Sequence, residues 1–204
     1  MHDVKLGIVD VIEAIADNKF LLGDQLVEIG FSGPDLRASL AAIALAQSEL
    51  GHARHLYNWS FALQNIDREV TEQTGNGFQQ IAQIGNWVEL MTWLYTVNVA
   101  AKIVLAALYE SEDPDVAKRV PKMLRELDEP ITFGREWCTV FTNESGSIPK
   151  VFSETFGEAN AQIEKWLEAV EHSEALKQAH YLKSQRLTQQ YRESVKKFDL
   201  VITS

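Results

Sequence analysis

The stretch LRASLAAIALAQSELGHARHLYNWSF, residues 36–61, decides how this chain folds. It is rich in alanine and leucine, so it predicts one long apolar helix. Within it, Glu49 and His52 stand three residues apart and therefore share one helical face. Four-helix bundles that hold two iron or manganese ions use this Glu-x-x-His pattern, with the carboxylate and the imidazole directed inward. The stretch therefore predicts a helical bundle arranged around a metal site or the remnant of one.

The rest of the chain continues the helical pattern. Apolar residues recur at steps of three and four, and strand signals are nearly absent. Proline, glycine and aspartate mark breaks between helices. We expect an all-α protein with a single domain, residues 1–204, whose bundle core covers about 4–142 and whose C-terminal helical extension covers about 150–204. The expected helices are 4–29, 36–64, 78–110 with a possible interruption at Gly85, 115–141 kinked at Pro130, 152–172 and 174–198.

Composition limits the function. The 204 residues are 46% hydrophobic, which suffices for one substantial core, and the net charge is −10. This acidic balance argues against duplex nucleic acid as a partner, because such binding requires phosphate neutralisation. The single cysteine, Cys138, excludes an internal disulfide and fits a reducing cytosol. The N-terminal segment 1–17 has acids at short intervals and resembles a mature helix more than a signal peptide. We therefore expect a cytoplasmic protein.

The most apolar run, residues 90–109, has the length that a bilayer span needs. It contains Asn98 and Lys102 near its middle, and each is costly in lipid. We therefore expect a buried bundle helix and no membrane partner. The glycines form no dinucleotide or phosphate loop.

A complete metal bundle needs ligands from all four helices, and only some of them are evident here. Upstream of Glu49, a separation of one helix and one loop points to Asp17, or less well to Asp24. On the expected fourth helix, Glu126 and Glu129 supply carboxylates, but no histidine stands beside them.

The expected third helix offers no acid between its ends, and Asn98 and Lys102 occupy the positions predicted to face inward. Buried carboxylates need a cation or protonation, which leaves two hypotheses. In the first, the Lys102 ammonium stands where a metal would and pairs with Glu49 or Glu126. In the second, a lone iron or manganese ion is bound, and metal analysis of the purified protein separates the two. The ligands of the second are Glu49, His52, Glu126 or Glu129, and Asp17.

Residues 17–57, DNKFLLGDQLVEIGFSGPDLRASLAAIALAQSELGHARHLY, resemble a known family. They are similar to the ferritin-like subunits of the bacterial phenylacetyl-CoA ring epoxidase, the PaaA/PaaC family, and most similar to PaaC. Residues 93–137 resemble it loosely and the last third hardly at all. The matching positions are Asp17-Asn18, Leu22-Gly23, Leu26 and Glu28, followed by Leu50-Gly51, Ala53-Arg54 and Leu56-Tyr57.

The resemblance implies a ferritin-like fold and a multi-subunit oxygenase that oxidises an aromatic ring on a CoA thioester. In such an assembly one subunit type holds the di-iron centre, and the PaaC type has the same bundle, has lost ligands and scaffolds the catalytic one. This chain keeps Glu49 and His52 like the catalytic type and lacks the histidine of the fourth helix like the structural type. We expect a PaaC-like subunit with a degenerate metal site, in a homo- or hetero-oligomer with a related ferritin-like catalytic subunit.

Two further function classes stay open. One is a stand-alone iron- or manganese-dependent oxidoreductase in which water or backbone groups replace the absent ligands; oxygen consumption with Fe(II) tests it. The other is a helical interaction protein with no redox role, whose buried charges only fix the packing. Co-purification with a related bundle subunit distinguishes this last class from the PaaC-like subunit.

Overall fold

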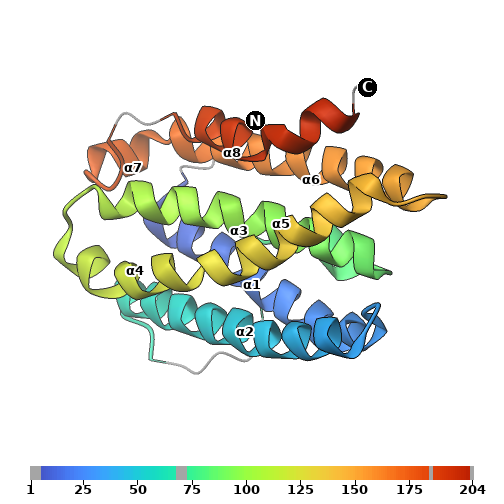
Figure 1. Ribbon diagram of the computed structural model, residues 1–204. Coiled ribbons are helices and arrows are strands. Elements are labelled where there is room, and N and C mark those ends of the chain that lie inside the picture. Colours follow the sequence, from blue (N-terminus) through green and yellow to red (C-terminus); the bar gives the residue numbers. More distant parts are fainter. Residues whose placement is uncertain (1–5, 68–72, 184–185, 203–204) are drawn as a thin grey trace. The chain divides into compact units, whose positions relative to one another are not determined.

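The computed structural model describes residues 6–67, 73–183 and 186–202, with side chains as far as residue 198. In this part of the chain every regular element is a helix (Figure 1). The predicted all-α fold is confirmed, and the helix content is consistent with a ferritin-like bundle with additional helices. The elements are α1 (Ile8–Ile29), η1 (Gly30–Ser32), α2 (Leu36–Gln64), η2 (Gln79–Gln83), α3 (Trp87–Tyr109), α4 (Pro114–Glu126), α5 (Asp128–Asn143), α6 (Ile148–Glu171), α7 (Glu174–Gln178) and α8 (Leu187–Ile202).

The chain divides into two compact units, which are described separately. The first is Ile8–Leu90, and the second combines Met1–Gly7 with Met91–Ser204. A single domain over residues 1–204 stays a prediction.

In the first unit, α1 and α2 pack against each other as an antiparallel pair (Figure 1). Near one end of the pair, Ser60 Oγ donates to Glu13 Oε1 over 2.6 Å. Toward the other end, a Cβ added to Gly23 would lie 2.6 Å from Leu50 Cγ, so only glycine permits this close approach of the two helices. The core of the pair consists of apolar residues at helical spacing, among them Val11, Ile12, Ile15, Leu22, Leu26, Leu45, Ala53 and Leu56.

In the second unit, α3, α5, α6 and α8 share an aromatic core. Tyr95 of α3 contacts Phe198 of α8 edge-on, with ring centroids 5.6 Å apart, and its hydroxyl donates to the Ser194 carbonyl over 3.2 Å. Phe152 and Phe156 of α6 also pack on Phe198. Edge-to-face ring pairs add to the stabilisation from area burial, so Phe198 is one of the residues that anchor α8, together with the buried Leu187, Tyr191 and Val195.

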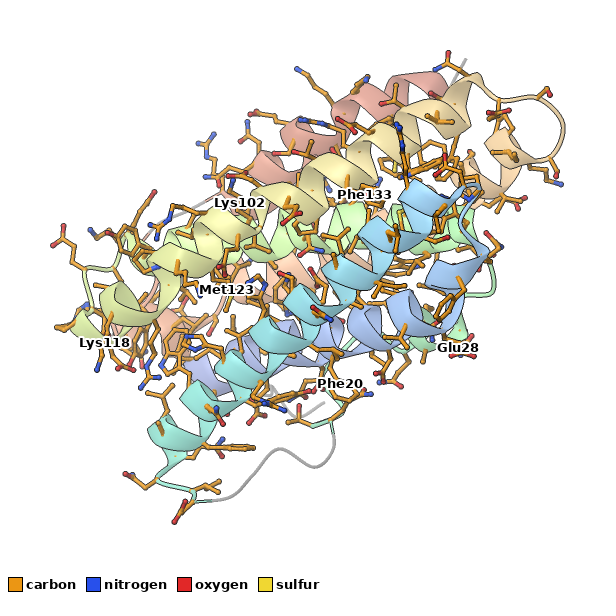
Figure 2. All side chains as sticks on the ribbon, turned by 60° about the horizontal axis from the view of Figure 1, so that its bottom comes forward. Phe20, Glu28, Lys102, Lys118, Met123 and Phe133 are labelled. Carbon is orange, nitrogen blue, oxygen red and sulfur yellow. The ribbon has the colours of Figure 1, made fainter. Side chains whose placement is uncertain are left out.

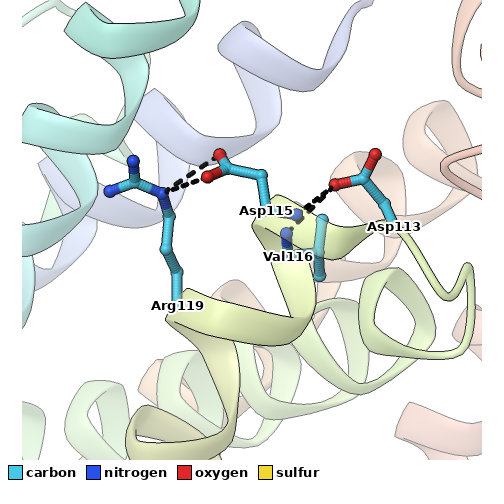
Figure 3. Close-up of polar contacts among 4 residues, drawn as sticks. All are labelled: Asp113, Asp115, Val116 and Arg119. Atoms are coloured by element: carbon cyan, nitrogen blue, oxygen red, sulfur yellow. Dashed lines mark hydrogen bonds and ion pairs between the residues drawn. The ribbon is translucent and has the colours of Figure 1, made fainter.

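The junction between α3 and α4 follows the expected stop-and-start pattern. Asp113 Oδ1 accepts from the amides of Asp115 and Val116, and Arg119 Nε donates to both Asp115 carboxylate oxygens (Figure 3). Pro114 occupies the first position of α4, where its missing N–H costs nothing. The break that proline and aspartate mark at residues 111–115 therefore starts this helix, one residue before the expected position.

Several predicted helix boundaries differ from the structure. The first helix begins at Ile8, and the helix expected from residue 152 begins at Ile148. The expected kink at Pro130 appears as a junction at Leu127, because Pro130 has no N–H for the carbonyl of residue 126. The third helix begins at Trp87 rather than 78, since Asn86 Oδ1 and the Glu89 carboxylate cap it reciprocally.

The final stretch, predicted as one helix over 174–198, is divided into α7 and α8. The first of these ends where His180 adopts a left-handed φ of 60° and the Tyr181 amide bonds the Leu176 carbonyl. At the other end of the chain, residues 4 and 5 of the first expected helix lie outside the described residues.

Helix α3 is the one described helix whose length and composition alone would allow a membrane span, and 83% of its most apolar window is buried within the protein. Asn98 is fully buried, and its Nδ2 donates to the Leu94 carbonyl over 2.9 Å. The inward position predicted for Asn98 is therefore confirmed.

Candidate functional site

The two residues that first suggested a metal bundle are both buried. Glu49 is 0% exposed and His52 is 6% exposed, one turn apart on α2. Their shared inward face, predicted from a spacing of three residues, is confirmed. A buried carboxylate requires a cation or a proton. Glu49 therefore needs a positively charged partner, or else it must be protonated.

The cation on Glu49 is the ammonium of Lys19. Its Nζ lies 2.9 Å from Glu49 Oε1, and both side chains are 0% exposed. Burial lowers the pKa of Lys19, and the charge and hydrogen bond of Glu49 oppose that effect. The other oxygen, Glu49 Oε2, is buried and accepts no hydrogen bond from the described residues. Lys19 and Glu49 thus form a buried ion pair between α1 and α2.

Asp17, the expected ligand on α1, is also fully buried, but it faces a different partner. Its carboxylate accepts from the Tyr57 hydroxyl and from the segment that follows α2. Burial, and after it the hydrogen bond to Asp17, raise the pKa of Tyr57. The segment contributes four donors: Thr74 N at 2.9 Å, Thr74 Oγ1 at 2.9 Å, Asn76 N at 2.7 Å and Gly77 N at 3.2 Å.

We call residues 74–78 the strap, because they are held along α1 by consecutive side chains. Next to Asp17, Asn18 Oδ1 accepts from the Phe78 amide over 2.7 Å. The strap needs both of its glycines. Gly75 has a left-handed φ of 89°, and a Cβ on Gly77 would lie 2.9 Å from Asp17 Cβ. The sequence predicts no helix between residues 64 and 78, but it does not identify Asp17 as the acceptor for this segment.

The remaining predicted residues belong to the second unit. Lys102 of α3 lies beside the start of α5 (Figure 2), and its ammonium contacts Asp128. The prediction that Lys102 pairs with Glu49 or Glu126 is therefore corrected: Glu49 pairs with Lys19, and Glu126 has Lys122 3.4 Å away on its own helix.

Glu129, at the start of α5, is exposed. Asp24 of α1, the alternative acid, is also exposed. Glu126 and Glu129 lie in a different unit from Glu49 and His52, so the joint ligand set stays a prediction. The sequence pattern does not identify Lys19 as the partner of Glu49. Lys19 stands two residues from Asp17, and the rotation of α1 about its own axis decides which of the two faces Glu49.

The residues of the α1–α2 pair do not fit a resident metal ion. A divalent cation at Glu49 would place its charge beside the Lys19 ammonium, and like charges at such range repel strongly in a buried site. The Asp17 carboxylate is already occupied by five hydrogen-bond donors. Across the described residues, no group of three or more His, Cys, Asp or Glu side chains is arranged to hold a metal.

Cys138 provides no alternative chemistry. It is fully buried in α5, and burial raises the pKa of its thiol, an effect that a hydrogen bond with Thr92 only partly opposes. A thiol held protonated is a poor nucleophile and a poor metal ligand.

Comparison with known proteins places this arrangement in a family. No curated protein matches the chain. The sequence model of one family, described as phenylacetic acid catabolic protein, matches residues 4–201, which is nearly the whole sequence and includes both the Lys19–Glu49 pair and the strap. The chain therefore belongs to the PaaA/PaaC family of phenylacetic acid catabolic proteins.

Proposed function

We propose that this chain is a PaaC-like, non-catalytic subunit of a multicomponent phenylacetyl-CoA type ring monooxygenase, with an ion pair in place of a metal centre. Membership of the family supports a role in phenylacetate catabolism. The observation that carries the finer proposal is the buried contact of Lys19 Nζ with Glu49 Oε1. A fixed ammonium satisfies the carboxylate that would otherwise need iron or manganese.

The Lys19–Glu49 pair explains how a bundle of this kind can stay folded without a metal ion, because the lysine compensates the charge of the buried carboxylate. Removing metal from a carboxylate site leaves uncompensated negative charge, which costs several kcal/mol or forces protonation. In this chain the compensating charge comes from α1 itself, so Glu49 joins α1 to α2 as a metal-bridging carboxylate would. The buried His52 then stands beside a site that is already neutral overall. The role left for such a bundle is structural support of a related catalytic subunit.

Elemental analysis and oxygen uptake test the proposal. The protein is expressed in medium supplemented with iron and manganese and purified without chelator. We expect well under one metal ion per chain, and no oxygen consumption after anaerobic loading with Fe(II) and a reductant. A matched Lys19→Gln variant controls for the ammonium. Stoichiometric iron or manganese in the wild-type protein would overturn the proposal in favour of a stand-alone oxidoreductase.

Co-expression with a PaaA-type catalytic subunit tests the subunit role. We expect a stable complex on size-exclusion chromatography and ring-oxidising activity that depends on both chains. A metal-free protein that neither binds such a subunit nor alters its activity would instead indicate a helical interaction protein with no part in the oxygenase.

A further inference from the structure

The strap contains the only Asn-Gly dipeptide in the sequence, Asn76–Gly77. Asn76 is exposed, and the strap residues form no helix. An asparagine can react with its own backbone, because the amide nitrogen of the next residue can attack the side-chain carbonyl carbon. Glycine at that next position gives the least steric hindrance and the most freedom of backbone rotation. The dipeptide therefore combines the sequence, the exposure and the irregular backbone that this reaction needs.

The reaction exchanges one amide bond for another and then consumes water. The Gly77 nitrogen loses its proton and bonds to Asn76 Cγ, while the Cγ–Nδ2 bond breaks and ammonia leaves, so that a cyclic succinimide remains. Water then opens the ring. Cleavage of the new N–Cγ bond gives aspartate, and cleavage of the original backbone C–N bond gives isoaspartate, in which the chain runs through Cγ. Either product carries a carboxylate where a neutral amide stood, and that carboxylate is ionised at neutral pH.

We propose that Asn76 is a deamidation site and that its reaction releases the strap from α1. The first reason is charge. Asn76 Nδ2 donates to Glu13 Oε2 over 3.3 Å, so deamidation replaces a hydrogen bond with a contact between two carboxylates, which repel each other. The Asp17 carboxylate lies beside them and is fully buried. Hydroxyl and amide groups of the described residues hold both Glu13 and Asp17, and these neutral donors leave the added charge uncompensated.

The second reason is the spacing of the backbone donors. The amides of Asn76 and Gly77 both donate to Asp17 Oδ2, over 2.7 and 3.2 Å. Isoaspartate inserts one further carbon between these two nitrogens and lengthens the chain by a bond of about 1.5 Å. The packing has no room for it, since a Cβ on Gly77 would lie only 2.9 Å from Asp17 Cβ. The two amides therefore lose their shared acceptor, and the Phe78 amide after them is drawn away from Asn18 Oδ1.

Release of the strap changes the surroundings of Asp17. The strap provides four of its five hydrogen-bond donors, and the remaining donor is the Tyr57 hydroxyl. A buried carboxylate that loses its donors must be reached by water or become protonated. The chain by itself cannot restore the amide once ammonia has left, so the release is one-way. Deamidation thus opens the contact between the strap and α1 as the protein ages.

Ageing of the purified protein tests the site. The wild type is held at physiological temperature and mildly alkaline pH, and deamidation is followed by peptide mass spectrometry with enzymatic labelling of isoaspartate. Asn65 and Asn143 are internal references, because both are exposed but precede isoleucine and glutamate. We expect Asn76 to react roughly tenfold faster than either reference, since it alone of the three precedes glycine. Asn76→Gln should accumulate almost no product, because glutamine would have to form a larger and slower ring.

Hydrogen exchange tests the release. In the aged wild type, the Gly77 and Phe78 amides of the deamidated fraction should exchange roughly tenfold faster than those of the unmodified fraction. Asn76→Asp should accelerate the same two amides in fresh protein, since it introduces the charge without the additional backbone carbon. Asn143→Asp is the matched control, because it adds the same charge outside the strap and should leave both amides unchanged. Circular dichroism checks that each variant keeps its helix content.

Two results would overturn the proposal, and neither depends on metal content or on assembly with a catalytic subunit. The first is an Asn76 that reacts no faster than Asn65 and Asn143 in the folded protein. The second is wild-type exchange of the Gly77 and Phe78 amides in both the deamidated protein and Asn76→Asp, which would show that the strap tolerates the added charge and the longer backbone.

Discussion

Lys19 Nζ and Glu49 Oε1 are 2.9 Å apart, and neither side chain has any exposed surface. Buried ion pairs add little net stability when compared with well-packed apolar residues, but breaking one partner leaves an uncompensated charge. The pair therefore keeps the buried carboxylate of α2 satisfied, as our proposal of an ion pair in place of a metal centre requires.

Replacing Lys19 should destabilise the protein strongly. We expect Lys19→Met to cost about 3–5 kcal/mol in the free energy of unfolding, because Glu49 is left buried without its cation. The double variant Lys19→Met/Glu49→Leu should regain most of this loss. Urea unfolding of both single variants and the double variant measures the coupling. Lys102→Met, at the partly exposed pair with Asp128, should cost less than about 1 kcal/mol. Additive effects of the two changes would contradict the direct pairing.

A single charge reversal should open the site to metal. In Lys19→Glu, two carboxylates and His52 face one another in the α1–α2 pair, and the buried negative charge then favours a divalent cation. We expect this variant to have a lower Tm than the wild type and to regain stability with Co(II) or Zn(II), whereas the wild-type Tm stays unchanged. Lys19→Glu/His52→Ala is the control and should respond less. Equal metal responses of the wild type and Lys19→Glu would contradict the idea that Lys19 excludes the ion.

The sequence predicted the α2 residues of this site, Glu49 and His52, but it did not predict their partner Lys19 on α1. The reason is geometric. The spacing of Glu49 and His52 within a single helix fixes their shared face, so their burial followed directly. Which α1 residue meets Glu49 depends on the rotation of α1, and each residue along the helix turns the face by about 100°. Asp17 and Lys19 therefore point in nearly opposite directions, and the contact of Gly23 with Leu50 helps to fix that rotation.

The hydrogen bonds between the strap and Asp17 were not predicted, for a different reason. Its donors to Asp17 are mainly the backbone amides of Thr74, Asn76 and Gly77, which leave no side-chain signature in the sequence. The position of this helix could be predicted from the sequence: α2 begins at Leu36 and ends at Gln64, as expected. Local periodicity determines helices, whereas contacts between a loop and a helix depend on tertiary packing.

Asp17 should hold the strap more strongly than any single donor does. Asp17→Asn removes the negative charge and turns an amide toward hydrogen-bond donors, so we expect a loss of about 2–4 kcal/mol in stability. Thr74→Val removes one hydroxyl bond and should cost about 1 kcal/mol. Hydrogen exchange of the Asn76 and Gly77 amides should accelerate in Asp17→Asn and change little in Thr74→Val. Unchanged protection in Asp17→Asn would show that the strap is held by other contacts.

Tyr57 should make the protein less stable in alkali. Burial and Asp17 raise the pKa of its hydroxyl above the ordinary value of about 10. Below about pH 10 both the folded and the unfolded chain keep the proton. Above it the unfolded chain releases the proton while the folded chain retains it, so stability falls as pH rises, by up to about 1.4 kcal/mol per pH unit. Tyr57→Phe should show a shallower fall in stability than the wild type in urea unfolding between about pH 9 and pH 11. Part of the fall should remain, because burial also raises the pKa values of Cys138 and Tyr181. Tyr109→Phe, at an exposed tyrosine, should keep the wild-type slope. Parallel curves for wild type and Tyr57→Phe across that range would mean that the hydroxyl ionises as easily in the folded protein as in the unfolded chain.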